Sequence, residues 1–300
     1  IPKPVPACAT PVSEGMTVLT HSARALDAQK SVMEFLLINH PLDCPICDQG
    51  GECELQDISI GYGTDVSRFS EGKRIVEDKN IGPLITTDMT RCIHCTRCVR
   101  FGTEIAGIRE MGETGRGEHL KIGTYIAATI DSEISANIID LCPVGALTAK
   151  PSLFKARAWE LQQAMSISAH DCLGSNVAIH SRRGEVIRVV PSENDSINES
   201  WLSDRDRFSY QALESDQRLT QPMIKVDGVW KETDWQTALN VAVDGLRKVK
   251  ETQGADSIAA IASPSSTTEE LFLLQKLMRD MGSSNIDTRL RRTDFSAENN

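Results

Sequence analysis

The spacing of apolar residues predicts a helix in the first part of the chain. Between about residues 28 and 39, apolar positions from Val32 to Ile38 recur at roughly helical spacing. Pro41 is expected to end this helix, because the residue before a proline is disfavoured in the helical region. The pattern therefore places His40 at the C-terminal end of a helix.

The next stretches predict a surface connection, short strands and a short helix. Residues 61–80 are polar and punctuated by glycines, which indicates a surface connection. Residues 116–130 mix glycine with β-forming side chains, including Tyr125 and Ile126, and predict short strands. Residues 156–161 predict a short helical connector to a different kind of domain.

Alternation of apolar and polar residues predicts a hairpin in the second half. The segments 177–180 and 185–190 alternate and are separated by Arg182-Arg183-Gly184, and Pro191 should end the second strand.

A βαβ unit is predicted near the end of the sequence. Residues 257–262 form a buried-strand candidate, and residues 286–288 could form the next strand. Between them, residues 269–281 predict an amphipathic helix. Its inward positions are expected to be Leu271, Leu274 and Leu277 or Met278. The unit lacks a GxGxxG motif, which argues against a nucleotide site.

Composition and charge limit the classes of protein. With 300 residues, 40% of them hydrophobic, the chain is long enough for two or more domains. A net charge of −10 argues against nucleic-acid binding. No apolar run is long enough to span a membrane, and the first residues lack a signal-peptide pattern, so we expect a soluble cytosolic protein. Both ends are expected to be cut from a longer chain.

Nine cysteines without a secretory signal point to metal chemistry rather than disulfides. Cys92, Cys95 and Cys98 stand at a strict three-residue interval, and Cys142 is followed by a proline. A [4Fe-4S] cluster suits this pattern, because each iron takes one sulfur and a distant cysteine can supply the fourth. We interpret these four residues as ligands of one such cluster, with a four-cysteine zinc site as the alternative. No second triplet exists, so this region should hold a single cluster.

His40, Cys44, Cys47 and Cys53 form another set of four candidate ligands. The spacing alone suits a zinc site or an iron-sulfur cluster equally, and the neighbouring cysteine set favours iron. The alternative is that His40 is only a residue at a helix end. An imidazole in place of a thiolate would remove negative charge from the cluster and favour its reduced form.

Three arginines flank the triplet and could offset the negative charge of a cluster. They are Arg91, Arg97 and Arg100. The alternative is that they are solvated surface charges.

Three stretches carry a resemblance to a known family. They are residues 39–47 (NHPLDCPIC), 50–56 (GGECELQ) and 91–100 (RCIHCTRCVR). With Cys142, these stretches resemble the large iron-sulfur subunit family of NADH-quinone oxidoreductase, respiratory complex I. The resemblance implies that both four-residue sets bind [4Fe-4S] clusters, one of them with a histidine ligand.

The resemblance implies an α+β multidomain fold in four parts. Residues 1–15 would end a [2Fe-2S] ferredoxin-like domain, with Cys8 as its last ligand and the other three ligands before Ile1. Residues 16–75 would form the histidine-ligated domain, a helical and loop domain, and residues 76–155 a single-cluster ferredoxin-like domain. Residues 156–300 would begin a molybdopterin-oxidoreductase-like β and α/β domain.

Cys172 would belong to that last part, where some family members carry an additional four-cysteine cluster. It has no companion cysteines at suitable spacing. We therefore expect no third [4Fe-4S] cluster and no molybdenum cofactor here, and we treat Cys172 as a small packed residue.

The implied function is an electron relay within NADH:quinone oxidoreductase, with no substrate-converting site in this chain. Electrons would come from NADH through flavin on a partner subunit and continue towards quinone, among other peripheral-arm subunits. The protein would lie in the cytoplasm on the inner face of the cell membrane, held there by the complex. Alternatives are an iron-sulfur subunit of an NAD-linked hydrogenase or formate dehydrogenase and, from another class, a zinc-stabilised interaction module.

Overall fold

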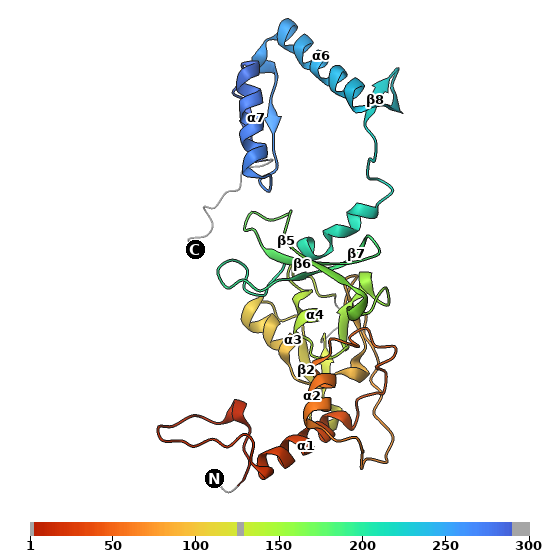
Figure 1. Ribbon diagram of the computed structural model, residues 1–300, viewed down its shortest axis with the longest axis vertical. Helices are drawn as coiled ribbons and strands as arrows, with labels where there is room; N and C mark the ends of the chain where they lie inside the picture. The colour runs from red at the N-terminus through yellow and green to blue at the C-terminus, as the bar shows by residue number, and fades with distance from the viewer. Residues whose placement is uncertain (1–2, 125–128, 290–300) are drawn as a thin grey trace. The chain divides into compact units, whose positions relative to one another are not determined.

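A computed structural model of the chain describes residues 3–124 and 129–289, and its elements are mixed α and β (Figure 1). The chain divides into two compact units. One comprises Ile1–Ser166 with Val177–Phe208, and the other comprises Ile167–Asn176 with Ser209–Asn300. The strand expected around Tyr125 and Ile126 lies outside the described residues.

The first predicted helix is present as α1 (Ala23–Leu37), but it starts and ends earlier than expected. Its start is set by Ser22, whose side chain accepts a hydrogen bond from the backbone N–H of Ala25. Because the helix ends at Leu37, His40 lies in the loop beyond it rather than in its last turn.

The buried face of α1 also differs from the predicted one. Val32 and Phe35 are exposed, whereas Met33 is buried. Met33 belongs to a small core with Leu55 of α2 (Glu54–Tyr62), a helix that was not predicted from the sequence. The surface connection expected at 61–80 is confirmed except at its start, where residues 61 and 62 belong to α2; residues 64–80 contain no helix or strand and are mostly exposed.

A short antiparallel ladder joins the two parts of the chain that carry the cysteine triplet and Cys142. Strand β1 (Ile85–Thr87) pairs with β4 (Leu147–Ala149), and Thr86 lies opposite Thr148. The ladder therefore explains how residues distant in sequence reach one site. The hydrophobic core around this ladder comprises Ile81, Ile85, Met89, Phe101, Met111, Ile122, Ile138 and Leu147.

Short helices fill much of this region. The triplet runs into α3 (Arg97–Arg100) and a π-helical turn (Phe101–Ile105), and α4 (Asn137–Leu141) leads to Cys142. In the described part of the chain, the 3-10 helices are Ala7–Ala9, Met89–Arg91, Gly117–His119, Lys150–Ser152, Ala158–Glu160, Ser209–Glu214 and Ala255–Ser257.

The strands predicted within residues 116–130 are confirmed in part. Strand β3 (Lys121–Gly123) pairs antiparallel with β2 (Gly112–Thr114). The helical connector predicted at 156–161 is present as the 3-10 turn Ala158–Glu160.

The predicted hairpin is confirmed. Strand β6 (Asn176–Arg182) pairs antiparallel with β7 (Glu185–Pro191), and β5 (Gln162–Ile167) lies on the other edge of β6. The turn residues Arg183 and Gly184 have φ of 54° and 86°, the left-handed conformation that a tight hairpin turn requires. A short helix, α5 (Asp204–Phe208), follows.

The second unit contains the predicted βαβ arrangement. Strands β10 (Ala260–Ile261) and β11 (Ile286–Asp287) are parallel and are connected through α7 (Thr268–Met281). Of the predicted inward positions, Met278 is buried, but Leu277 is exposed.

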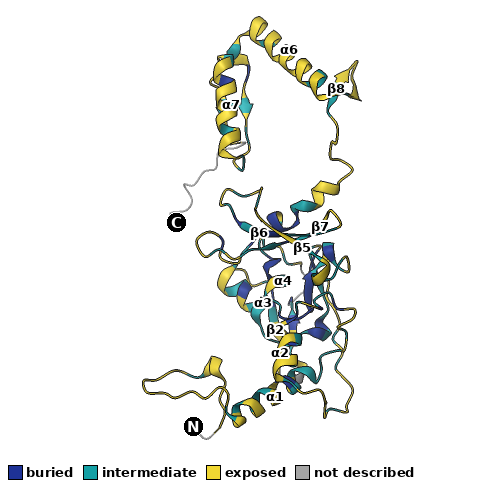
Figure 2. Cartoon of the chain, in the orientation of Figure 1, coloured by how far each residue is buried: buried dark blue, intermediate teal, exposed yellow. Residues whose placement is uncertain are grey.

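Other elements of this unit were not predicted. They are the hairpin of β8 (Met223–Val226) and β9 (Val229–Glu232) and the helix α6 (Trp235–Gln253). Both α6 and α7 are largely exposed (Figure 2).

Candidate iron-sulfur sites

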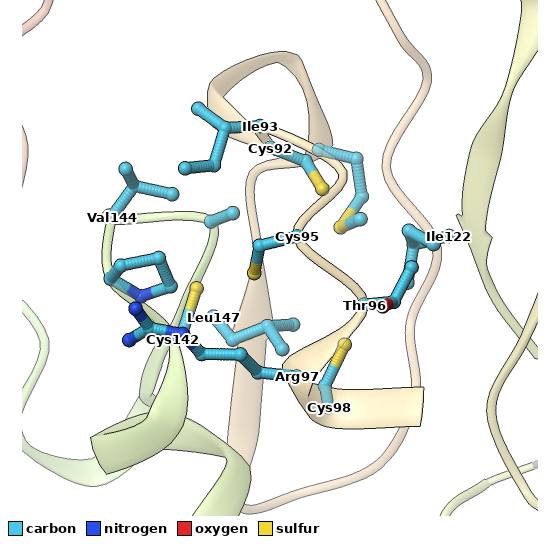
Figure 3. Close-up of a pocket in the computed structure, with 13 residues that line it drawn as sticks. Cys92, Ile93, Cys95, Thr96, Arg97, Cys98, Ile122, Cys142, Val144 and Leu147 are labelled. Atoms are coloured by element: carbon cyan, nitrogen blue, oxygen red, sulfur yellow. The ribbon is translucent and has the colours of Figure 1, made fainter. Parts of the chain in front are cut away.

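The cysteine triplet and the distant fourth cysteine line one pocket. Figure 3 shows the sulfur atoms of Cys92, Cys95, Cys98 and Cys142 facing this space. The pocket encloses about 340 Å³, including the part open to solvent. Its other lining residues are Met89, Ile93, Thr96, Arg97, Ile122, Pro143, Val144, Ala146 and Leu147.

The backbone between the cysteines is folded tightly. His94 and Thr96 have φ of 55° and 61°, a region that side chains other than glycine rarely adopt. This turn brings the backbone N–H of His94 within 3.4 Å of Cys92 Sγ, to which it donates. The local strain therefore accompanies a loop that holds three sulfurs around one space.

Burial makes these thiols unfavourable as free thiolates. It raises the pKa of Cys92 to about 11 and that of Cys98 to about 12, and the neighbouring cysteines raise both further. Burial also raises the pKa of Cys142, although backbone N–H groups oppose it. Thiolates at Cys92, Cys98 and Cys142 are therefore favoured only when a positive centre is bound beside them.

The four sulfurs line one pocket but are not arranged around a single point. Among the described residues, no three His, Cys, Asp or Glu side chains are placed to hold a single metal ion. Tetrahedral zinc needs all its ligands at about 2.3 Å from one point. A cluster with four separate iron corners fits a common pocket lined by four separated sulfurs better.

His40 lies in the loop before Cys44, with a ring nitrogen that lacks a protein partner. Its Nδ1 atom is buried and forms no hydrogen bond. Burial lowers the pKa of His40, while a hydrogen bond with the Arg91 backbone opposes this. A neutral imidazole with an unused buried nitrogen suits a metal ligand.

The three cysteines predicted to act with His40 differ in exposure. Cys47 and Cys53 are buried, whereas Cys44 is exposed. Burial raises the pKa of Cys53, and the charges of Cys47 and Cys44 raise it further. The donor chemistry fits an iron-sulfur cluster, and the exposed Cys44 leaves one side of the site open.

Phe154 and Arg157 hold the loop that carries these cysteines. The guanidinium of Arg157 donates to the carbonyls of Cys47 and Pro45, and the Phe154 N–H donates to Asp48 Oδ1 at 3.0 Å. These contacts were not predicted from the sequence, because they join parts of the chain more than 100 residues apart.

Strand β7 supports the same loop. Arg188 forms two hydrogen bonds of 2.6 Å with the two oxygens of Glu52, the neighbour of Cys53. Its Nε also donates to His180 Nδ1 at 3.0 Å. The paired hydrogen bonds between Arg188 and Glu52 restrict both the position and the orientation of the loop next to Cys53.

The three flanking arginines have different environments. Arg91 is buried and pairs with Asp43 at 3.1 Å and with Asp88 at 2.8 Å. Arg97 lines the pocket and pairs with Glu54, while Arg100 is exposed. The interpretation as solvated surface charge is therefore wrong for Arg91.

The two remaining cysteines are both exposed. Cys8 lies in the 3-10 turn Ala7–Ala9. The expectation that Cys172 is packed is wrong. The preceding Asp171 accepts hydrogen bonds from the backbone N–H groups of Leu173 and Gly174. This turn leaves the Cys172 side chain exposed to solvent.

Four family models match successive regions of the chain. Residues 29–68 match the NADH-ubiquinone oxidoreductase-G iron-sulfur binding region, and residues 82–148 match the ferredoxin-like domain of NADH-quinone oxidoreductase subunit 3. Residues 161–211 match an NADH-ubiquinone oxidoreductase NDSU1/NuoG-like 4Fe-4S domain, and residues 218–299 match molybdopterin oxidoreductase. Fold and matches define an iron-sulfur protein with a molybdopterin-oxidoreductase-like part.

Curated relatives narrow this class. The chain is 52% identical over 284 residues to the G subunit of NADH-quinone oxidoreductase from Rickettsia conorii, which covers 95% of this chain and 42% of the relative. It is 50% identical over 285 residues to the NADH-ubiquinone oxidoreductase 75 kDa subunit of Reclinomonas americana, covering 95% and 41%. The chain belongs to this family of NADH-quinone oxidoreductase subunits and spans about two fifths of the length of these relatives.

A solved structure is also similar. It is an NAD+-reducing [NiFe]-hydrogenase in the H2-reduced state, 27% identical, with a TM-score of 0.45 and coverage of 50% of this chain and 65% of that chain. A TM-score this low supports no conclusion about function.

The third matched region contains a single cysteine. Between residues 161 and 211 the sequence has only Cys172, so three of the four thiols of an all-cysteine cluster are missing there.

No helix in the described part of the chain is long and apolar enough to cross a membrane.

Proposed function

We propose that this chain is an electron-relay part of NADH:quinone oxidoreductase. The observation that carries the proposal is the common pocket of Cys92, Cys95, Cys98 and Cys142, in which four partly buried cysteines from distant parts of the sequence face one space. These residues would hold one [4Fe-4S] cluster. His40, Cys44, Cys47 and Cys53 would hold a second.

Iron-sulfur clusters accept and release single electrons when bound. The residues of this chain would supply the ligands, exclude water from the sulfurs and hold the ligand loops in place. The burial of Cys47 and Cys53 and the partial burial of the four pocket cysteines support this role. No proton transfer or nucleophilic step is needed from the protein.

The relay would be part of a larger assembly. Electrons would arrive from NADH through a flavin-bearing partner subunit and leave towards quinone, with other peripheral-arm subunits as neighbours. In the full-length protein, Cys8 would complete a [2Fe-2S] cluster. The protein would be peripheral on the inner face of the cell membrane, and the four domains would be 1–15, 16–75, 76–155 and 156–300.

Iron and acid-labile sulfide analysis of the anaerobically purified full-length protein tests the proposal. Cys98→Ser should lower the iron content by about four atoms per chain. The exposed Cys172 gives a matched control, and Cys172→Ser should leave the content unchanged. A colourless protein with stoichiometric zinc would contradict the relay and support the zinc-stabilised module instead.

A further inference from the structure

The segment that follows Cys142 lies against thiols of the other ligand set. Cys53 Sγ donates to the Pro143 carbonyl at 3.6 Å. A Cβ atom added to Gly145 would lie only 2.2 Å from Cys47 Sγ. Residues 143–145 therefore contact two buried sulfurs of the histidine-containing set, and they directly follow Cys142, which belongs to the other set.

Gly145 is needed here for space rather than for backbone conformation. It is not among the glycines with positive φ, so its dihedral angles are open to other residues. The added Cβ would also lie 3.2 Å from Gln49 Cβ. Both obstacles belong to the 44–53 loop, so any larger side chain at 145 must push that loop away.

Arg91 connects the same parts from another side. Its Nη1 donates to the Gly145 carbonyl at 3.4 Å, and its Nη2 pairs with Asp43 at 3.1 Å. Asp43 directly precedes Cys44, and Arg91 directly precedes Cys92. Only 9% of the Arg91 side chain is exposed, and its guanidinium group connects the two ligand loops.

We propose that Gly145 and Arg91 are positioning residues that fix the separation of the two ligand sets, Gly145 by permitting close approach and Arg91 by tying the loops together. The inference rests on the proposed function, because the separation matters for electron transfer only if both sets hold clusters. Transfer between two centres slows steeply as the gap widens. The absence of a side chain at position 145 would then keep the two clusters close enough for rapid electron transfer.

The test uses the full-length protein in its complex, isolated anaerobically, with Gly145→Ala as the variant. Gly61→Ala is the matched control, because an added Cβ at Gly61 meets nothing within 4 Å. Iron content, the paramagnetic resonance spectrum, the midpoint potential of each cluster and the magnetic interaction between the reduced clusters are measured. Gly145→Ala should alter the signature of the histidine-ligated cluster and weaken the interaction, whereas Gly61→Ala should change neither.

A second variant decides the question if Gly145→Ala prevents folding. Arg91→Lys keeps the charge but removes the fork that reaches Asp43 and the Gly145 carbonyl together. It should shift the potential of at least one cluster and weaken the interaction, while Arg68→Lys, at an exposed pair with Glu34, should not.

The outcomes separate the two proposals. A wild-type protein without iron-sulfur signals contradicts the relay itself. A wild-type protein with both signals, together with unchanged potentials and an unchanged interaction in a folded Gly145→Ala protein, overturns only the positioning role. Where Gly145→Ala does not fold, unchanged values in Arg91→Lys overturn it.

Discussion

Asn137 and Leu202 exchange two hydrogen bonds across 65 positions of sequence. The Leu202 N–H donates to Asn137 Oδ1 at 2.9 Å, and Asn137 Nδ2 donates to the Leu202 carbonyl at 2.8 Å. Asn137 is 1% exposed and begins α4, the helix that ends next to Cys142. The position of a candidate ligand therefore depends on the segment that follows the β6–β7 hairpin.

Asn137→Ala should destabilise the protein by about 2–4 kcal/mol, because it leaves the buried N–H and C=O of Leu202 without partners. Denaturant unfolding measures the loss, and iron content should fall in parallel. Asn240→Ala, at an exposed position on α6, is the control and should change stability by less than about 0.5 kcal/mol. Equal stability of the two variants would show that the Leu202 contacts are not important.

The candidate ligands could be recognised from sequence because their spacing is local. Cys92, Cys95 and Cys98 lie within seven residues, a spacing typical of cysteines that bind an iron-sulfur cluster. The hairpin and the βαβ unit were also predictable, since alternation and helical periodicity are local patterns too.

The supporting residues could not be predicted, because their partners are distant in sequence. Nothing near Arg188 indicates that it pairs with Glu52, and nothing near Arg157 indicates the carbonyls of the 44–53 loop. The buried face of α1 was misjudged for a related reason. Exposed apolar residues such as Phe35 give the same periodic signal as buried ones.

Replacing His40 should change one cluster only. His40→Cys adds a thiolate and hence negative charge, so the midpoint potential of that cluster should fall. His40→Ala should change its resonance spectrum or remove one cluster. Redox titration followed by paramagnetic resonance measures both effects, with the exposed His21→Ala as control. Two unaltered clusters in either variant would remove His40 from the proposed ligands.

Arg188→Gln should loosen the loop that carries Cys53. The change leaves the partly buried carboxylate of Glu52 without its two charge-assisted hydrogen bonds, at a cost of about 1–3 kcal/mol. Iron should be released to a chelator faster than from the wild type. Arg247→Gln, at an exposed 3.7 Å pair with Asp244, should not alter the release.

A double variant checks that the Arg188 effect comes from this pair. Glu52→Gln combined with Arg188→Gln leaves no unpaired charge and should recover part of the lost stability. Additive losses in the double variant would contradict the coupling.

Asp204 should make stability depend on pH. Burial raises its pKa above the ordinary 3.8, although hydrogen bonds from the Ser135 hydroxyl and the Ala136 N–H oppose this. Between 3.8 and the raised pKa the folded chain binds more protons than the unfolded chain, so this carboxyl makes the free energy of unfolding fall as pH rises through that window. Asp204→Asn removes the dependence, because the amide does not titrate, and it can accept from the Ala136 N–H with its oxygen and donate to the Ser135 hydroxyl with its NH2 group. Urea unfolding over a pH series should therefore show the variant gaining stability relative to wild type from pH 3.8 upward, reaching a constant difference above the raised pKa. The exposed Asp216→Asn serves as control, and a pH-independent difference between wild type and Asp204→Asn would contradict the assignment.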